Sequence, residues 1–177
     1  MKSKISYFCY AKARSHTLSM DFMGSIYNFK HNHKNFTNCE HIVPRSRFIN
    51  YNSLKVLKYD LHNLYPCCIY LNSQRKNHKY TEFNYANTFE RPKFHFIPPD
   101  YAKGKIARTC LYLIQLYPDV KDTIHQNVID KNLIIDWHLE YQPDDNELKR
   151  EWLIGKIQGN INPLVLNPEK IECMDIF

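Results

Sequence analysis

The segment CEHIVP, residues 39–44, places a carboxylate and an imidazole side by side in a short stretch with β-branched residues. Such a stretch is typical of a strand, and Pro44 favours a loop directly after it. Because side chains alternate across a strand, Glu40 and His41 are expected to point to opposite sides. The segment therefore predicts a strand over 39–43 that presents two chemically different groups.

Two further segments follow it in the chain. DLHNL at 60–64 predicts a second short strand, and Pro66 suits the first position of a helix. That helix would carry Asn72 near its end, and Arg75 would share its face three residues later. The polar, basic stretch from 45 to 59 is expected to be a connection. Residues 1–37 are interpreted as a helix followed by a loop or strand.

The second half of the chain predicts helices. After Pro98-Pro99-Asp100, apolar residues recur at helical spacing up to Pro118: Ile106, Ala107, Cys110, Leu111, Ile114 and Tyr117. A further apolar stretch begins with Leu133, Ile134 and Trp137. A last helix is expected between an Asp144-Asp145 cap and a Gly159 C-cap, holding Leu148, Trp152, Leu153 and Ile157. Strands are few and helices carry the mass, so the fold class is α+β, in one domain over 1–177.

The composition indicates the class of binding partner and the cellular compartment. The 177 residues include 24 Lys+Arg and 18 Asp+Glu, a formal charge of +6 that favours a polyanion such as nucleic acid. No apolar run reaches the length of a signal peptide or a membrane span. The six cysteines, at 9, 39, 67, 68, 110 and 173, are sparse and suit reduced thiols. These features predict an intracellular protein, secreted only if a leader was removed. The oligomeric state is left open by the sequence, with a monomer as the default.

The chemistry of Glu40, His41 and Asn72 suits hydrolysis of a phosphodiester. Such a reaction needs a nucleophilic water, neutralisation of an anionic transition state and stabilisation of the leaving alkoxide. A histidine with a pKa near neutrality can act as general base. A hard cation such as Mg²⁺ takes only one or two protein oxygens and can serve the other two needs. Glu40 and Asn72 supply one carboxylate and one amide oxygen.

The ordered motifs resemble one known family. Between residues 39 and 168 stand EHIVP at 40–44, DLHNLYP at 60–66, NSQRKN at 72–77, PPD at 98–100 with GKIART at 104–109, and IQGNINP at 157–163. This series is similar to the bacterial endonuclease I family of ββα-metal (His-Me finger) nucleases. The first 38 residues carry no motif of that family that we identify.

The resemblance implies a β-hairpin and a helix that grip one Mg²⁺, for which Mn²⁺ or Ca²⁺ could substitute. It implies cleavage of DNA, and RNA as a further substrate, largely without sequence preference and with 5′-phosphate and 3′-hydroxyl ends. His41 matches the general base, and Glu40 and Asn72 match the metal ligands. For the cations that act on phosphate, Arg75 is the first choice and Arg108 joins it in the expected catalytic set. Arg45 and Arg47 stay open as candidates.

The same residues also occur in two other conceivable classes of protein. A zinc-stapled, non-catalytic nucleic-acid-binding module would use Cys39, His41, His62, Cys67 and Cys68, but no Cys-x2–4-Cys pair is present. An inactive protein that kept the fold is a third possibility, against which the intact Glu40, His41 and Asn72 weigh. For Arg108 and Lys105, a solvated helix face competes with a face toward nucleic acid.

The remaining polar residues favour supporting roles. His62 is expected to brace a catalytic neighbour or bond to backbone, and Asp60 to act as a support or cap. The polar residues of the closing motif, Gln158, Asn160 and Asn162, are expected either to tie the last helix back to the site or to cap it. His31 and His33, with the lysines around them, suit a basic loop.

Overall fold

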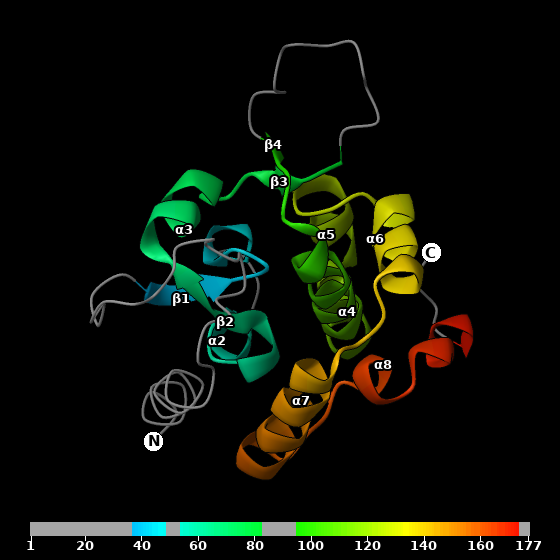
Figure 1. Cartoon of the computed structure of the whole chain (residues 1–177). Helices are drawn as coiled ribbons and strands as arrows, with labels where there is room; N and C mark the ends of the chain where they lie inside the picture. The colour runs from blue at the N-terminus through cyan, green and yellow to red at the C-terminus, as the bar shows by residue number, and fades with distance from the viewer. Residues whose placement is uncertain (1–36, 49–53, 83–94, 174–177) are drawn as a thin grey trace.

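The computed structural model describes residues 37–48, 54–82 and 95–173. Figure 1 shows a small hairpin with short helices on one side of the long helix α4, and further helices on the other. Helices and small sheets are both present, so the predicted α+β class is confirmed. The expectations for residues 1–36, including the basic loop at His31 and His33, lie outside the described residues.

The hairpin begins with β1 (Thr37–His41), which pairs antiparallel with β2 (Leu64–Cys68). In the register, Glu40 stands opposite Tyr65 and His41 opposite Leu64. Among the described residues, the short elements between the strands in sequence are η1 (Arg45–Arg47), α2 (Leu54–Leu57) and η2 (Leu61–Asn63). Helix α3 (Ile69–Arg75) follows β2 directly and packs on both strands.

The sequence prediction was wrong about the start of the second strand. Residues 61–63 form a 3-10 turn because the Asp60 carboxylate accepts a hydrogen bond from the backbone N–H of His62, which caps the turn. Pro66 lies inside β2 and not at a helix start, and α3 begins three residues later. A proline is tolerated there because each strand of a two-stranded sheet has a free edge.

The predicted later helices are confirmed, with additional short elements between them. Asp144 caps α7 by accepting from the backbone N–H of Glu147, and Gly159 ends that helix with a φ of 86°. The order is β3 (Lys79–Tyr80), β4 (His95–Phe96), α4 (Asp100–Leu116), η3 (Pro118–Val120), α5 (Lys121–Asn127), α6 (Lys131–Glu140), α7 (Asp145–Gln158), α8 (Pro163–Leu166) and η4 (Pro168–Cys173).

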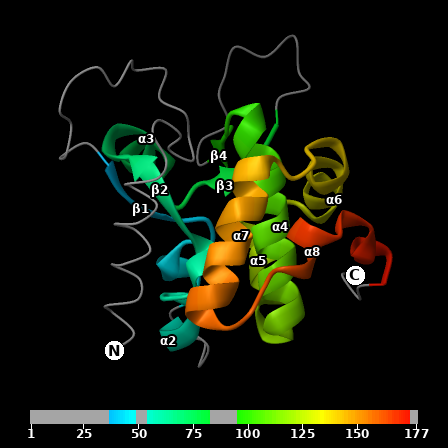
Figure 2. The same cartoon turned by 60° about the horizontal axis from the view of Figure 1, so that its bottom comes forward.

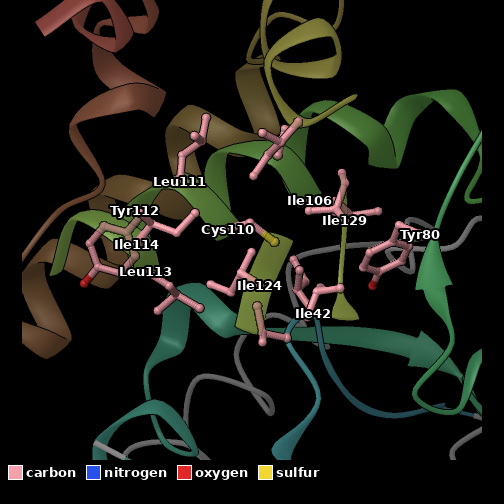
Figure 3. Packing of buried hydrophobic residues seen from close by; sticks show 14 of the residues in the cluster. Ile42, Tyr80, Ile106, Cys110, Leu111, Tyr112, Leu113, Ile114, Ile124 and Ile129 are labelled. Atoms are coloured by element: carbon pink, nitrogen blue, oxygen red, sulfur yellow. The ribbon is translucent and has the colours of Figure 1, made fainter. Parts of the chain in front are cut away.

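The core lies around α4. Figure 3 shows Ile106, Cys110 and Leu113 of this helix among side chains from α5 and from the strand exit at Ile42. Cys110 is fully buried, as expected from its place on the apolar stripe. Hairpin and helices therefore share one hydrophobic cluster. Among the described residues, no helix combines the length and apolar character that a membrane crossing requires.

Helix α7 buries charge rather than its aromatic residue. Its buried side chains are Glu147, Glu151 and Ile154, whereas Trp152 is 59% exposed. Figure 2 shows α7 in front of α4, with the hairpin on one side and α6 and α8 on the other. The two glutamates are therefore directed at partners on other elements.

Candidate functional site

Glu40 is held by Arg75 inside the protein. Nη1 of Arg75 donates to Oε1 of Glu40 at 2.6 Å, and the two side chains are 1% and 3% exposed. The same guanidinium donates to the carbonyl oxygens of His41 and Ile42 and stacks on the Tyr80 ring at 4.4 Å. Burial raises the pKa of Glu40 to about 7, although Arg75 acts in the opposite direction. Arg75 thus fixes the strand that carries Glu40.

Asn72 lies against the same strand. Its Nδ2 donates to Oδ1 of Asn38 at 2.6 Å and to the backbone oxygen of Cys39 at 3.3 Å. In the described part of the chain, both hydrogen bonds of this side chain are made by the nitrogen. Helix α3 therefore brings an amide oxygen with spare acceptor capacity next to the strand of Glu40.

His41 stands at the end of β1 and is partly buried. Its Nε2 lies 3.2 Å from the backbone oxygen of Lys58. A carbonyl oxygen can only accept, so Nε2 carries the proton and Nδ1 of the neutral ring keeps its lone pair. Burial lowers the pKa of His41, and the positive charges of Arg45, Lys58 and Arg75 lower it further. The ring is therefore held in its neutral form with Nδ1 able to accept a proton.

Asn63 clamps the strand exit just after His41. Its Oδ1 accepts from the backbone N–H of Val43 at 2.8 Å, and its Nδ2 donates back to the Val43 oxygen at 3.2 Å. The backbone N–H of Ile42 also donates to the backbone oxygen of Asn63. Sequence analysis missed this residue. Its signal was an asparagine at the end of a short strand-like run, where side-chain bonds to the backbone are common.

A buried network of charged side chains stabilises η2. Nδ1 of His62 lies 2.9 Å from Oδ1 of Asp60, and Nε2 lies 3.0 Å from Oε1 of Glu151. Both ring nitrogens face carboxylate acceptors, so both donate and the ring is an imidazolium. Burial alone would lower the pKa of His62, but the hydrogen bonds to Asp60 and Glu151 raise it. His62 therefore braces the site, and Glu151, which sequence analysis missed, is its partner.

The closing motif reaches back to the same turn. Gln158 accepts from the backbone N–H of Leu61 at 2.8 Å and donates to Asp60 at 3.0 Å. Asn160 donates to the Tyr112 hydroxyl, and Asn162 donates to the Arg108 backbone oxygen while it caps α8. The first of the two sequence interpretations, a tie between the last helix and the site, is therefore present together with capping.

The arginines and Lys105 differ in their exposure to solvent and in their partners. Arg108 is 1% exposed, not on a solvated face, because Glu147 takes two of its nitrogens at 2.7 and 2.6 Å. Lys105 pairs with Asp144. Arg47 donates to the Asn77 backbone oxygen at 2.9 Å. Of the arginines that the structure describes, Arg45 is exposed and has no hydrogen-bond or ion-pair partner there.

Of the side chains of the zinc alternative, the structure describes Cys39, His41, His62 and Cys67, and these do not form one site. Both ring nitrogens of His62 are taken by carboxylates, and Cys67 is fully buried. Burial raises the pKa of Cys39 to about 11, so its thiol is far from the thiolate that binds zinc. Within 37–48, 54–82 and 95–173, no three His, Cys, Asp or Glu side chains are grouped to hold a metal. A hard cation with one carboxylate and one amide oxygen as ligands fits the residues better.

Charge is distributed unevenly over the molecule. Segments 37–48 and 54–82 contain seven Lys and Arg residues against three acidic ones. All three acidic side chains pair with cations of the protein: Glu40 with Arg75, Asp60 with His62, and Glu82 with Lys103. Segment 95–173 has nine Lys and Arg against twelve acidic residues. Among the described residues, the excess of positive charge therefore lies in the two segments that carry Glu40, His41 and Asn72, where it favours a polyanion.

Comparison with known proteins gives a matching family model and several similar proteins. A family model described as Endonuclease I matches residues 10–169, so the match begins well before residue 39, where sequence analysis set the limit. Endonuclease-1 of Buchnera aphidicola subsp. Baizongia pistaciae is 32% identical over 126 residues, which cover 66% of this chain and 49% of that protein.

Two proteins of Aeromonas hydrophila are also similar. The extracellular deoxyribonuclease is 27% identical over 60% of this chain and 48% of its own length, and the periplasmic deoxyribonuclease is 28% identical over 60% and 46%. The chain spans about half the length of the curated relatives it matches. The names of these relatives contradict the expectation of an intracellular protein, which rested on the lack of a recognisable leader and on the sparse cysteines.

Proposed function

We propose, on the premise that this chain belongs to the endonuclease I family, that it is a metal-dependent endonuclease that hydrolyses DNA. The observation that carries the proposal is the meeting of three groups at one strand. Glu40 and His41 are consecutive in β1, and Asn72 is bonded to the same strand through the Cys39 carbonyl. β1, β2 and α3 would then be the ββα-metal core. RNA is a further candidate substrate.

In this mechanism His41 is the general base. Its Nε2–H is engaged by the Lys58 carbonyl, so Nδ1 accepts the proton of the attacking water. The lowered pKa of His41 keeps the ring neutral near pH 7 and ready to accept. Water attacks phosphorus opposite the 3′ oxygen, and the products carry 5′-phosphate and 3′-hydroxyl ends.

Glu40 and Asn72 would hold the cation, with Mg²⁺ the first choice and Mn²⁺ or Ca²⁺ as substitutes. The donor set fits, because one carboxylate and one amide oxygen suit a hard ion that keeps several waters. When bound, such an ion neutralises charge on the phosphate and stabilises the departing oxygen. Arg75 holds Glu40 in place from the interior and acts as a positioning residue.

The phosphate contact is assigned to Arg45. The donor groups of Arg75 and Arg108 are engaged by glutamates and by backbone oxygens inside the protein, which argues against direct contact with substrate for both. Arg45 is exposed in η1, four residues after His41, and its charge acts on that ring. Because relatives are named extracellular and periplasmic deoxyribonucleases, we place the proposed activity outside the cytoplasm.

A plasmid-cleavage assay tests the function. Wild-type protein is incubated with supercoiled DNA and Mg²⁺, with EDTA, and in parallel as His41→Ala and His95→Ala. We expect cleavage by wild type and by His95→Ala, loss of cleavage with EDTA, and at least a hundredfold lower rate for His41→Ala. His95 is an exposed residue of β4 and serves as the matched control. A folded wild type that binds DNA without cutting it would contradict the proposal.

A further inference from the structure

Asn38 is placed to control which atom of Asn72 is offered to a ligand. It lies on β1 opposite Cys67 in the register, and its side chain is exposed. Its Oδ1 accepts the short 2.6 Å bond from Asn72 Nδ2, which also approaches the Cys39 carbonyl at 3.3 Å. Two acceptors on one strand thus face a single amide nitrogen on α3.

The direction of these bonds is fixed by chemistry. The Cys39 carbonyl can only accept, so the Asn72 atom that faces it is the nitrogen and not the oxygen. Asn38 must then present its own oxygen, because two NH₂ groups cannot bond to each other. If the Asn72 amide were flipped, its oxygen would face the Cys39 carbonyl without a proton between them. Both contacts therefore leave Oδ1 of Asn72 directed away from these two acceptors.

We propose that Asn38 is a positioning residue that locks the Asn72 amide so that Oδ1 is presented to the divalent cation. This inference rests on the proposed function, in which Asn72 is a metal ligand. Glu40 is positioned in a similar way, because the buried Arg75 side chain donates a hydrogen bond to its Oε1. Each proposed ligand thus has one atom bound by a neighbouring side chain. Neighbours that orient a ligand change metal affinity by about 10–100-fold when they are removed.

Direct metal binding by the full chain is the experiment. Mn²⁺ affinity is measured by electron paramagnetic resonance without DNA, for wild type, Asn38→Ala, Asn38→Asp, Asn72→Ala and the control Asn132→Ala. Asn132 is an exposed asparagine on α6. We expect about tenfold weaker binding for Asn38→Ala, the lower end of the range, because the Cys39 carbonyl still holds Nδ2. Asn38→Asp keeps an acceptor that cannot donate, so it should bind at least as tightly as wild type.

The variants separate the two levels of the argument. Weaker binding by Asn72→Ala with unchanged binding by Asn38→Ala would overturn the role of Asn38 alone. A loss in Asn38→Asp equal to that in Asn38→Ala would also overturn it, because an added negative charge can only favour the cation. Unchanged binding by Asn72→Ala would remove the metal site itself and the inference with it. Circular dichroism of each variant confirms that it is folded.

In the cleavage assay the same variants give a second readout. For Asn38→Ala, the Mg²⁺ concentration for half-maximal activity should rise by the same factor as the Mn²⁺ dissociation constant, and kcat at saturating Mg²⁺ should stay near wild type. A fall in kcat without a change in Mg²⁺ dependence would contradict a positioning role toward the cation.

Discussion

The guanidinium of Arg75 and the carboxylate of Glu40 are 2.6 Å apart and almost inaccessible to water. The pair joins the end of α3 to the last residue but one of β1. Two more bonds from Arg75 reach the carbonyl oxygens of His41 and Ile42, so one side chain fixes the last two residues of β1 and the residue that follows them. The orientation of Glu40 and His41 therefore depends on an interior cation.

Replacing Arg75 by alanine should lower the free energy of unfolding by about 3–5 kcal/mol, because the Glu40 charge is left buried without a partner. Urea unfolding measures the change. Arg45→Ala is the control and should stay within about 0.5 kcal/mol, as expected for an exposed side chain. An Arg75→Ala protein of wild-type stability but without activity would instead indicate that Arg75 contacts the substrate.

Replacing Arg45 by alanine should weaken DNA binding by about 1.5–3 kcal/mol, roughly 10–150-fold, as expected for a hydrogen bond to a charged group, and reduce the salt dependence of binding by about one phosphate contact. Fluorescence anisotropy at several salt concentrations, in EDTA, measures both quantities. Lys149→Ala, which removes an exposed charge from α7, is the matched control. Equal salt dependence for Arg45→Ala and wild type would exclude a phosphate contact.

The His62 network should make stability depend on pH. The pKa of His62 is raised in the folded state, so its contribution is fully present below the unfolded pKa of about 6.5 and is lost as pH rises through the folded value. The pKa of Asp60 is lowered against the effect of burial by His62 and Gln158, so its contribution is lost as pH falls through the folded value. Urea unfolding of wild type should therefore show decreasing stability from about pH 6.5 upward.

His62→Ala supplies the comparison for that experiment. It should be less stable by about 3–5 kcal/mol at pH 6, since Asp60 and Glu151 lose their shared cation. The difference from wild type should shrink as pH rises above about 6.5, because the unfolded His62 releases its proton there while the folded imidazolium keeps it. A constant difference between pH 6 and pH 9 would show that His62 is not charged in the folded protein.

Gly104 and Gly155 should respond oppositely to alanine. A Cβ at Gly104 would lie 2.1 Å from the Tyr141 backbone oxygen and 2.7 Å from Arg108. Gly104→Ala should therefore cost about 3 kcal/mol of unfolding free energy, the upper end for overpacking. At Gly155 the nearest atom is the Cγ2 methyl of Ile161, which is 46% exposed and can move. Gly155→Ala should be neutral or stabilising, by up to about 1 kcal/mol of helix propensity. Thermal unfolding of both variants tests the contrast.

How far sequence alone could describe this molecule depends on the range of the interactions involved. Apolar periodicity and local caps located α4, α6 and α7, because these signals lie within a few residues. The burial of two glutamates on α7 could not be predicted, because glutamates are normally exposed. Glu147 and Glu151 are buried only because Arg108 and His62, 39 and 89 residues away in sequence, supply the opposite charges. No local pattern reports such a partner.

The same difference between local signals and long-range contacts applies to the candidate site. Its motifs predict the residue types, and the structure brings Asn72 to the strand of Glu40 and His41. The roles of these residues remain predictions. The structure separates the candidate arginines by their exposure: Arg75 and Arg108 are buried and paired with glutamates, whereas Arg45 is exposed. Asn38 carried no signal in sequence, because its contact with Asn72 joins a strand to a helix 34 residues later.

The bond from Gln158 to Asp60 spans 98 residues of sequence. During synthesis, at about 5–20 residues per second, the hairpin would therefore wait on the order of 5–20 s before its last support leaves the ribosome. Until then His62 lacks Glu151, and the turn that positions Asn63 lacks Gln158. A nascent nuclease built in this order would acquire its working geometry only near the end of translation, which delays cleavage of nucleic acid close to the ribosome.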